Sequence, residues 1–261
     1  MDRWRGLVSP GIAFLLAFAI LIGLGTWQLR RLAWKTEVLR QIAERTTAPP
    51  QPLPTEAMWP DLKQPDYAYR HVTLTGTYLH QDEAHVFRPL SPETARGPFK
   101  GLGDLVLTPL RLADGSIVIV NRGFVPSDKV ASSTRPGGQV MGPVTVTGLM
   151  REPEGRNLFT PADDPVGGTW FTRDPAAIAA WYHLDRVAPF TVDADAAALP
   201  GGLPQGGETI LEIPNNHLSY ALTWFGLAAG LCLVFAGFAW KRLAAHGDAA
   251  APPGPAAAKR L

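Results

Sequence analysis

Two long stretches without a charged residue lie near the two ends of the chain, and they constrain its fold more than any other feature. The first covers residues 7–25 and the second covers residues 218–240. At about 1.5 Å of rise per helical residue, each stretch matches the roughly 30 Å thickness of a bilayer's hydrocarbon core. A backbone in lipid must satisfy its own hydrogen bonds, so both stretches are predicted to be membrane-spanning helices.

The first stretch can also be interpreted as a cleaved signal peptide, because Arg3 and Arg5 precede it. It is long for the apolar part of a signal, however, and no small-x-small cleavage site precedes the polar sequence that begins at Gln28. A retained helix is therefore favoured.

Basic residues outside the two stretches favour cytoplasmic termini, because Arg3 and Arg5 precede the first and Lys241 and Arg242 follow the second. The basic residues between positions 30 and 45 favour the opposite orientation. Long translocated domains are largely exempt from the charge rule, so we expect the domain between the helices to lie outside the cytoplasm.

The segment between the two helices shows many short strand patterns separated by turn signals. This predicts a mainly antiparallel β domain, a small barrel or sandwich with one short helix. Residues 105–112 and 117–124 flank Ala-Asp-Gly-Ser, which is a strong hairpin signal. Residues 175–182 read as the short helix, with Asp174 as its N-cap. Further strands are predicted at residues 69–78, 84–90, 140–149 and 190–192, and residues 210–213 lead into the second helix.

These signals predict the domain organisation of the chain. The expected parts are an N-terminal tail (1–6), a first membrane helix (7–29), a helical extension with a Pro-rich linker (30–66), a β domain (67–213), a second membrane helix (214–240) and a disordered C-terminal tail (241–261).

Several function classes are disfavoured by composition and motifs. The formal net charge of +1 gives no argument for nucleic acid. The sequence has no nucleophile elbow, no phosphate-binding Gly-rich loop and no Cys-x-x-Cys. Its single cysteine, Cys232, cannot form a disulfide within the chain. We therefore do not expect an enzyme.

Two groups of histidines are candidate metal ligands. His71, His80 and His85 fall in or near the first two strands, where separate surface histidines are the simpler interpretation. His217 is different, because it lies in the first turn of the second helix. The positive end of the helix dipole disfavours imidazolium there, and a neutral ring is the form that binds a metal.

The second helix is expected to present two distinct faces. Gly226 and Gly230 form a small-x-x-x-small pair, so we expect their face to pack on the first helix. The opposite face is expected to stay open, and it carries His217, Tyr220, Ala221, Trp224 and Ala228.

A hairpin of two helices places the end of the first helix at the depth of His217. An imidazole, aromatic rings and nearby guanidinium groups would suit a flat, apolar, dianionic ligand such as haem. Interfacial Trp, Tyr and Arg are also ordinary membrane anchors, so both interpretations stay open. The candidate haem-binding residues are His217 as axial iron ligand, with Tyr220, Trp224, Trp27, Arg30 and Arg31.

Four segments, in consistent order, resemble the surfeit locus protein 1 family. They are Gly25-Thr-Trp-Gln-Leu-Arg-Arg-Leu-Ala-Trp-Lys35, Tyr69-Arg-His-Val-Thr-Leu-Thr-Gly-Thr-Tyr78, Gly115-Ser-Ile-Val-Ile-Val-Asn-Arg-Gly-Phe-Val-Pro126 and Pro214-Asn-Asn-His-Leu-Ser-Tyr-Ala-Leu-Thr-Trp-Phe225. The resemblance implies a non-enzymatic assembly factor for cytochrome c oxidase that binds haem A and helps to place it in subunit I.

The resemblance also implies a histidine ligand on the second helix, which matches His217, and a functional link to haem A synthase. Mitochondrial members carry a long presequence, whereas about six residues precede the first helix here, so we expect a bacterial inner membrane and a periplasmic domain. Two alternatives stay open: a cofactor-free scaffold for an oxidase intermediate, and a membrane enzyme acting on a periplasmic lipid or peptide.

Overall fold

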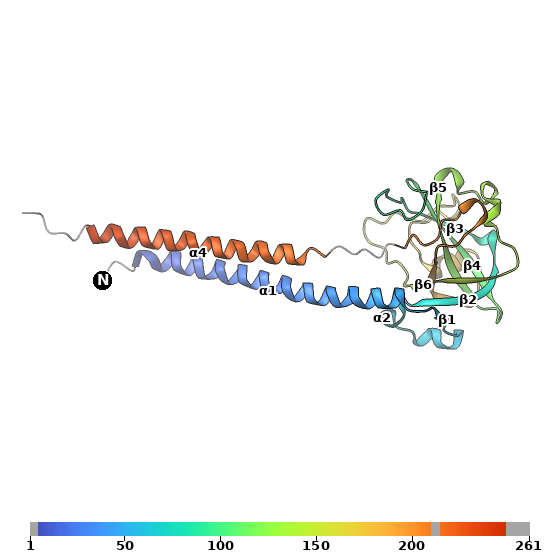
Figure 1. Ribbon diagram of the computed structural model, residues 1–261, viewed down its shortest axis with the longest axis horizontal. Helices are drawn as coiled ribbons and strands as arrows, with labels where there is room; N and C mark the ends of the chain where they lie inside the picture. The colour runs from blue at the N-terminus through green and yellow to red at the C-terminus, as the bar shows by residue number, and fades with distance from the viewer. Residues whose placement is uncertain (1–4, 210–214, 249–261) are drawn as a thin grey trace, which may run out of the picture. The chain divides into compact units, whose positions relative to one another are not determined.

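The computed structural model describes residues 5–209 and 215–248, which form two compact units. The helix unit comprises residues 1–39 and 213–261, and the barrel unit comprises residues 40–212. Each unit has its own internal packing (Figure 1).

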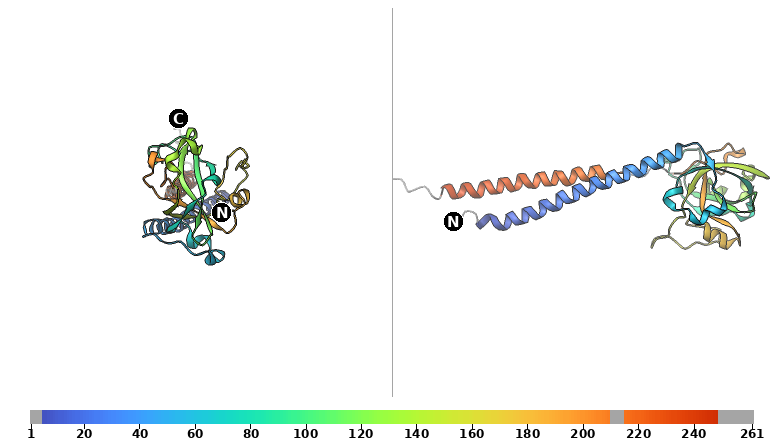
Figure 2. Two further views of the ribbon diagram at one scale, coloured as in Figure 1. Left: turned by 90° about the vertical axis from the view of Figure 1, so that its right-hand side faces the viewer. Right: turned by 90° about the horizontal axis from the view of Figure 1, so that it is seen from below.

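The helix unit is an antiparallel pair formed by α1 (Arg5–Thr47) and α4 (His217–Asp248). Phe14 stacks on Phe235 with ring centroids 4.4 Å apart. Near the other end of the pair, Gln28 of α1 contacts His217, the first residue of α4. The two helices run side by side in both views (Figures 1 and 2). Both are long and apolar enough to cross a membrane, which confirms the prediction of two candidate membrane helices.

The prediction for the faces of α4 is wrong. Ala221 and Ala228 are buried, whereas Gly226 and Gly230 are exposed, and a Cβ added at either glycine would meet nothing within 4 Å. The close approach comes instead from a glycine of α1: a Cβ on Gly25 would lie 2.6 Å from the ring of Phe225. A large ring on one helix fits over a glycine on the other, so the glycine pair on α4 is not needed for packing.

Helix α1 continues without a break to Thr47, as the basic extension predicts, and its residues 40–47 belong to the barrel unit. The predicted Pro-rich linker contains more structure than expected. It holds a short strand β1 (Gln51–Pro52), a 3-10 turn η1 (Glu56–Asp61) and a short helix α2 (Gln64–Tyr67). Trp59 and Tyr67 of these elements bury their rings against Phe190 in the core.

The barrel unit is built on a seven-stranded sheet in the order β1-β2-β6-β7-β5-β4-β3. An additional pairing between β2 and β4 closes five of these strands into a barrel. The strands are β2 (His71–Tyr78), β3 (Ala84–Phe87), β4 (Gly103–Leu112), β5 (Ile117–Pro126), β6 (Pro143–Arg151) and β7 (Val187–Ala194). Closure removes the free edges that an open sheet of this size would present.

Each predicted strand that falls on described residues is present, and most pairings are antiparallel, which confirms the fold class. The exceptions are two parallel pairings, β5 with β7 and β1 with β2. The helix α3 (Pro175–Trp181) also forms as predicted, and the carboxylate of Asp174 accepts hydrogen bonds from the first-turn amides. Residues 210–213, predicted to lead into the second helix, lie outside the described residues.

Two large apolar clusters and a smaller one around Val106, Val125 and Leu203 hold the described part of the barrel unit together. The interior cluster is centred on Phe190, Met150 and Val120 and fills the barrel. A second cluster lies on the outer face of β4 and β5, where Leu107 and Ile119 pack against Ile178 of α3. Successive side chains of β4 and β5 point alternately into these two clusters, which explains the alternating pattern of the sequence.

The second helix is longer than the sequence predicts. Its apolar run ends at Trp240, but α4 continues to Asp248. The rest of the predicted C-terminal tail, residues 249–261, and the start of the predicted N-terminal tail, residues 1–4, lie outside the described residues.

Candidate functional site

The candidate site of the helix unit is a hydrogen bond between His217 and Gln28. The Nδ1 atom of His217 lies 2.7 Å from Oε1 of Gln28. An amide oxygen only accepts hydrogen bonds, so Nδ1 must carry the proton and donate it. In the neutral ring, the proton on Nδ1 leaves Nε2 with its lone pair. Among the described residues, the structure records no partner for Nε2 of His217.

The partner of His217 is held firmly, because the side chain of Gln28 is only 8 % exposed between the two helices. Gly25 and Gln28 are both buried, and they lie about one helical turn apart on α1. The contact of Gly25 with Phe225 therefore brings the helices close enough for the side chain of Gln28 to reach the imidazole.

Trp224 adds an unsatisfied polar atom to the same face of α4. It lies seven residues, or about two turns, from His217, with the buried Ala221 between them. The Nε1 atom of Trp224 is buried and has no hydrogen-bond partner among the described residues. A buried indole N–H without an acceptor costs free energy, and a ligand that supplied an acceptor would recover it.

The remaining predicted site residues do not join this contact. Trp27 and Tyr220 are exposed, although each is adjacent in sequence to a buried residue of the helix pair. Arg30 is also exposed. The guanidinium of Arg31 lies over the ring of Trp34, 3.9 Å from its centroid. The structure therefore brings His217 together with Gln28, a residue that the sequence placed only at the same depth.

The three strand histidines do not form a metal site. His71 bonds to the carbonyl of Ala48 and to the carboxylate of Asp195, at 2.9 and 2.8 Å. His80 and His85 lie instead around Glu83. Within residues 5–209 and 215–248, no group of three or more His, Cys, Asp or Glu side chains could hold a metal ion.

The segment Asn121-Arg122-Gly123 of β5 connects two buried clusters of charged residues, a role that the sequence did not reveal. Neighbouring residues on a strand point to opposite faces of the sheet. Asn121 donates to Asp193 at 2.9 Å, whereas Arg122 contacts Glu83 at 3.1 Å on the other face. Gly123 has a φ of 120°, and a Cβ there would lie 1.9 Å from the carbonyl oxygen of Gln205.

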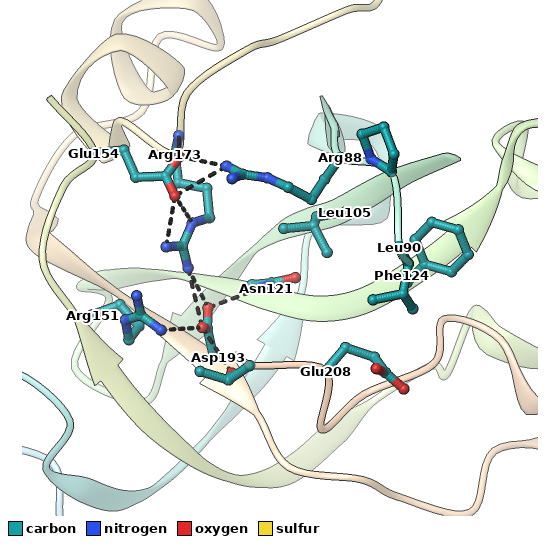
Figure 3. Close-up of a pocket in the computed structure, with 12 residues that line it drawn as sticks. Arg88, Leu90, Leu105, Asn121, Phe124, Arg151, Glu154, Arg173, Asp193 and Glu208 are labelled. Carbon is teal, nitrogen blue, oxygen red and sulfur yellow. Dashed lines mark hydrogen bonds and ion pairs between the residues drawn. The ribbon is translucent and has the colours of Figure 1, made fainter. Parts of the chain in front are cut away.

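The outer cluster surrounds Asp193 of β7 (Figure 3). Its carboxylate accepts from Arg173 at 2.8 Å, from Arg151 at 3.3 Å and from the hydroxyl of Thr209 at 2.9 Å. Arg173 also bonds to Glu154. Burial by itself would raise the pKa of Asp193, but the charges of Arg173 and Arg151 lower it below its usual value.

The inner cluster surrounds Glu83, which lies between β2 and β3. Its carboxylate contacts Arg135 at 2.6 Å and Arg122 at 3.1 Å. Burial would raise the pKa of Glu83, but hydrogen bonds from His85 and Arg135 and the charges of both arginines hold it well below its usual value. Both clusters keep their carboxylates ionised, so their chemistry is that of structural ion pairs rather than of proton transfer.

Comparison with known proteins places the chain in a family. The model of the SURF1 family matches residues 15–229, which include most of α1, the whole barrel unit and the first part of α4 with His217 and Trp224. The mouse protein named Surfeit locus protein 1 is 36 % identical over 239 residues, covering 87 % of this chain and 72 % of the mouse protein.

Two further relatives give the same result. Surfeit locus protein 1 of Homo sapiens is 35 % identical over 237 residues, covering 87 % of this chain and 74 % of the human protein. A SURF1-like protein of Monosiga brevicollis is 37 % identical over 236 residues, covering 87 % of this chain and 83 % of that protein. The chain belongs to the SURF1 family.

The candidate site of this SURF1-family protein provides one oriented nitrogen ligand in an apolar setting. One imidazole with a free Nε2 can supply an axial ligand to a metal whose other ligands come from a macrocycle. It cannot by itself hold a free metal ion, which needs several protein ligands. The unpaired N–H of Trp224 and the apolar faces of both helices also fit a large planar ligand. The donor set therefore fits haem better than a free metal ion.

Proposed function

We propose that this SURF1-family protein is a membrane-anchored assembly factor that binds haem A and aids its insertion into subunit I of a haem-copper cytochrome c oxidase. One observation carries the proposal: the imidazole of His217 is fixed through Nδ1 by Gln28, and Nε2 keeps a free lone pair. Histidines that ligate metals are typically held in this way, with the second ring nitrogen donating to a fixed acceptor.

Each proposed residue has a defined task. Haem, when bound, supplies an iron that takes an axial nitrogen, and His217 would provide that nitrogen through Nε2. Trp224 would donate its unpaired N–H, and Trp27 and Tyr220 would rotate their exposed rings onto the macrocycle. Because haem must later be passed on, a single protein ligand is better suited than a fully enclosed pocket.

Arg30 and Arg31 are proposed to bind the propionates. Arg30 is exposed and ready to pair. Arg31 would have to leave the ring of Trp34, and an exposed cation–π contact is worth only about 0.5–1 kcal/mol. Charge-assisted hydrogen bonds between a guanidinium and a carboxylate are roughly twice as strong as neutral ones. Replacing the contact of Arg31 with Trp34 by a contact with a propionate is therefore favourable in an apolar setting.

The proposed location is a bacterial inner membrane, with both termini in the cytoplasm and the barrel unit in the periplasm. The basic residues outside the two uncharged stretches, Arg3, Arg5, Lys241 and Arg242, support this orientation. The proposed partners are subunit I of the oxidase and haem A synthase, with no nucleic acid and no catalytic role.

The visible spectrum of the purified full-length chain tests the proposal. Protein coexpressed with haem A synthase is expected to show haem A absorption, and His217→Ala is expected to lose it. His183→Asn is the matched control, because His183 is exposed in the barrel unit and has a positive φ that asparagine tolerates. A colourless wild-type protein, or an unchanged spectrum for His217→Ala, would contradict the proposal.

A cofactor-free scaffold is the second candidate, and the same hydrogen bond supports it. Polar side chains that bond between membrane helices can serve packing alone. If the protein is colourless but still co-purifies with subunit I, and Gln28→Leu abolishes that association, the scaffold function is favoured.

A further inference from the structure

A cavity of about 430 Å³ lies at the end of the barrel where β2 and β7 finish and β6 begins. We call it the barrel-mouth cavity. Its walls are mostly apolar, with Val144 and Val146 from β6 and Ala194 and Ala197 from the end of β7 and the loop after it. Tyr78 and Arg122 contribute polar groups. The volume lies within the range of small-molecule sites, which are usually apolar with a few well-placed polar groups.

The cavity borders a buried positive charge that the protein does not balance. Glu83 is the carboxylate recorded in contact with Arg122 and Arg135 among the described residues. The side chains of all three are nearly inaccessible, at 5, 3 and 1 % exposure for Glu83, Arg122 and Arg135. Two guanidinium groups therefore share one carboxylate, and a buried charge without a counter-charge is costly.

The neighbouring histidines do not supply the missing negative charge. Nε2 of His80 lies 2.9 Å from the carbonyl of Val140, and Nδ1 faces both Arg122 and Glu83, so this ring brings no negative charge. A protonated His85 beside Glu83 would only add to the positive excess.

Arg122 is the member of this cluster that faces the cavity, and it retains a donor for an incoming anion. Its recorded hydrogen bonds go to Glu83, His80, the carbonyl of Gly138 and the side chain of Tyr78, whereas a guanidinium has five N–H donors, so one donor remains for an anion. The ring of Tyr78 stacks on the guanidinium, 4.6 Å from its centroid, and fixes its plane. Burial lowers the pKa of Arg122, which reflects a charge that its surroundings do not fully compensate.

Asp195, the second charged residue that lines the cavity, does not repel an anion strongly. Asp195 lines the cavity, but its carboxylate pairs with His71 at 2.8 Å. Both nitrogens of His71 face acceptors, Ala48 and Asp195, and these hydrogen bonds raise the pKa of His71 against the effect of burial. The pair is therefore close to neutral where His71 is protonated.

We propose that the barrel-mouth cavity binds a small amphiphile with one carboxylate head and a short apolar body. The head pairs with Arg122 and supplies the counter-charge that Glu83 alone does not provide. The body lies against Val144, Val146 and Ala197. This site belongs to the barrel unit and does not depend on haem or on the helix unit.

Methyl-labelled full-length protein in nanodiscs of phosphatidylcholine tests the proposal, with sodium octanoate as the probe and 1-octanol as its uncharged analogue. Octanoate is expected to shift the methyl resonances of Val144, Val146 and Ala197 in a saturable manner. Val86 and Ile178, which belong to the cluster on the outer face of β4 and β5, serve as unshifted controls. Octanol is expected to bind about tenfold more weakly, because it lacks the charge that Arg122 recognises.

Two variants complete the experiment. Ala197→Trp fills the rim of the cavity from an exposed position, so it is expected to abolish the shifts without unfolding the barrel. Ala162→Trp, at an exposed position outside the cavity, is the matched control. The absence of saturable shifts at Val144 and Val146, equal binding of octanoate and octanol, or unchanged binding by Ala197→Trp would each overturn the proposal.

Discussion

The helix unit and the barrel unit treat buried polar groups in different ways. In the barrel unit, the buried charges of Asp193 and Arg173 pair with each other, whereas the cluster of Glu83 holds two guanidinium groups for one carboxylate. In the helix unit, His217 uses one ring nitrogen and leaves the other free, and Trp224 leaves a buried N–H unpaired. Paired charges stabilise a structure, whereas an oriented and unsatisfied group is what a ligand needs. The comparison separates the structural network around Asp193 from the candidate binding site at His217.

The largest effect is expected from removing the central carboxylate of the barrel unit. Asp193→Ala leaves Arg173 and Arg151 without their shared partner, and breaking a buried ion pair typically costs about 3–5 kcal/mol. Hydrogen exchange of peptides from β5 and β7 is expected to rise sharply, whereas α4 stays protected. Asp128→Asn, an exposed carboxylate in the same unit, is the control and is expected to change little. Equal loss of protection in α4 would contradict the separation of the two units.

The second prediction concerns the pH dependence of the barrel unit. The hydrogen bonds of His71 to Ala48 and Asp195 raise its pKa in the folded state, despite burial. A raised pKa stabilises the fold fully below the unfolded value of about 6.5, and this contribution is lost as pH rises through the folded value. We expect the free energy of unfolding to fall by about 1 kcal/mol across this window. In His71→Gln the same measurement is expected to be flat, and an identical slope in both proteins would refute the assignment.

In the helix unit, we expect Gln28→Leu to change stability less but to alter the NMR spectrum of the His217 imidazole. Gln28→Leu removes the acceptor of Nδ1, and hydrogen bonds between membrane helices average about 0.6 kcal/mol. The proton of His217 is then free to move to Nε2, which ¹⁵N NMR of the imidazole distinguishes from the native tautomer. Thr26→Val is the control, because the hydroxyl of Thr26 bonds only to carbonyls of its own helix. An unchanged imidazole spectrum in Gln28→Leu would show that Gln28 does not set the tautomer.

The smallest effect is expected at the glycines that were predicted to pack and do not. Gly226→Ala and Gly230→Ala place a methyl group in open space. Each is expected to leave the helix pair unchanged, within about 0.5 kcal/mol, apart from the small gain in helix propensity. Gly25→Ala is the contrasting variant, because its methyl group would collide with the ring of Phe225. Cross-linking between cysteines introduced on α1 and α4 measures both, and weaker pairing in Gly226→Ala would reinstate the rejected packing face.

The elements of the fold could be predicted because each has a local signal. Apolar length gave α1 and α4, alternation gave β2, and the Asp-Gly turn gave the hairpin of β4 and β5. The pairing of β5 with β7 could not be predicted, because a parallel pairing depends on residues that are distant in the chain and has no turn signal. The burial of Trp59 is not predicted for a similar reason, since the surrounding prolines indicate a linker.

The candidate site was predictable only in part. His217 could be located from its place at the start of α4, but its bond to Gln28 depends on the relative rotation of the two helices. The sequence predicts that rotation wrongly, because the Gly226 and Gly230 pair forms a packing motif, whereas a single glycine such as Gly25 gives no such signal. The roles of Asn121 and Arg122 depend on carboxylates at positions 193 and 83, and only the folded barrel brings these together.

The most direct test of the account is resonance Raman spectroscopy of the reduced, haem-loaded protein, purified with natural histidine and with ¹⁵N-labelled histidine. The account predicts an iron–histidine stretching band that moves to lower frequency with the label and is absent in His217→Ala. A haem-loaded protein whose spectrum shows no labelled band, or in which the band persists in His217→Ala, would contradict the assignment of His217 as the axial ligand.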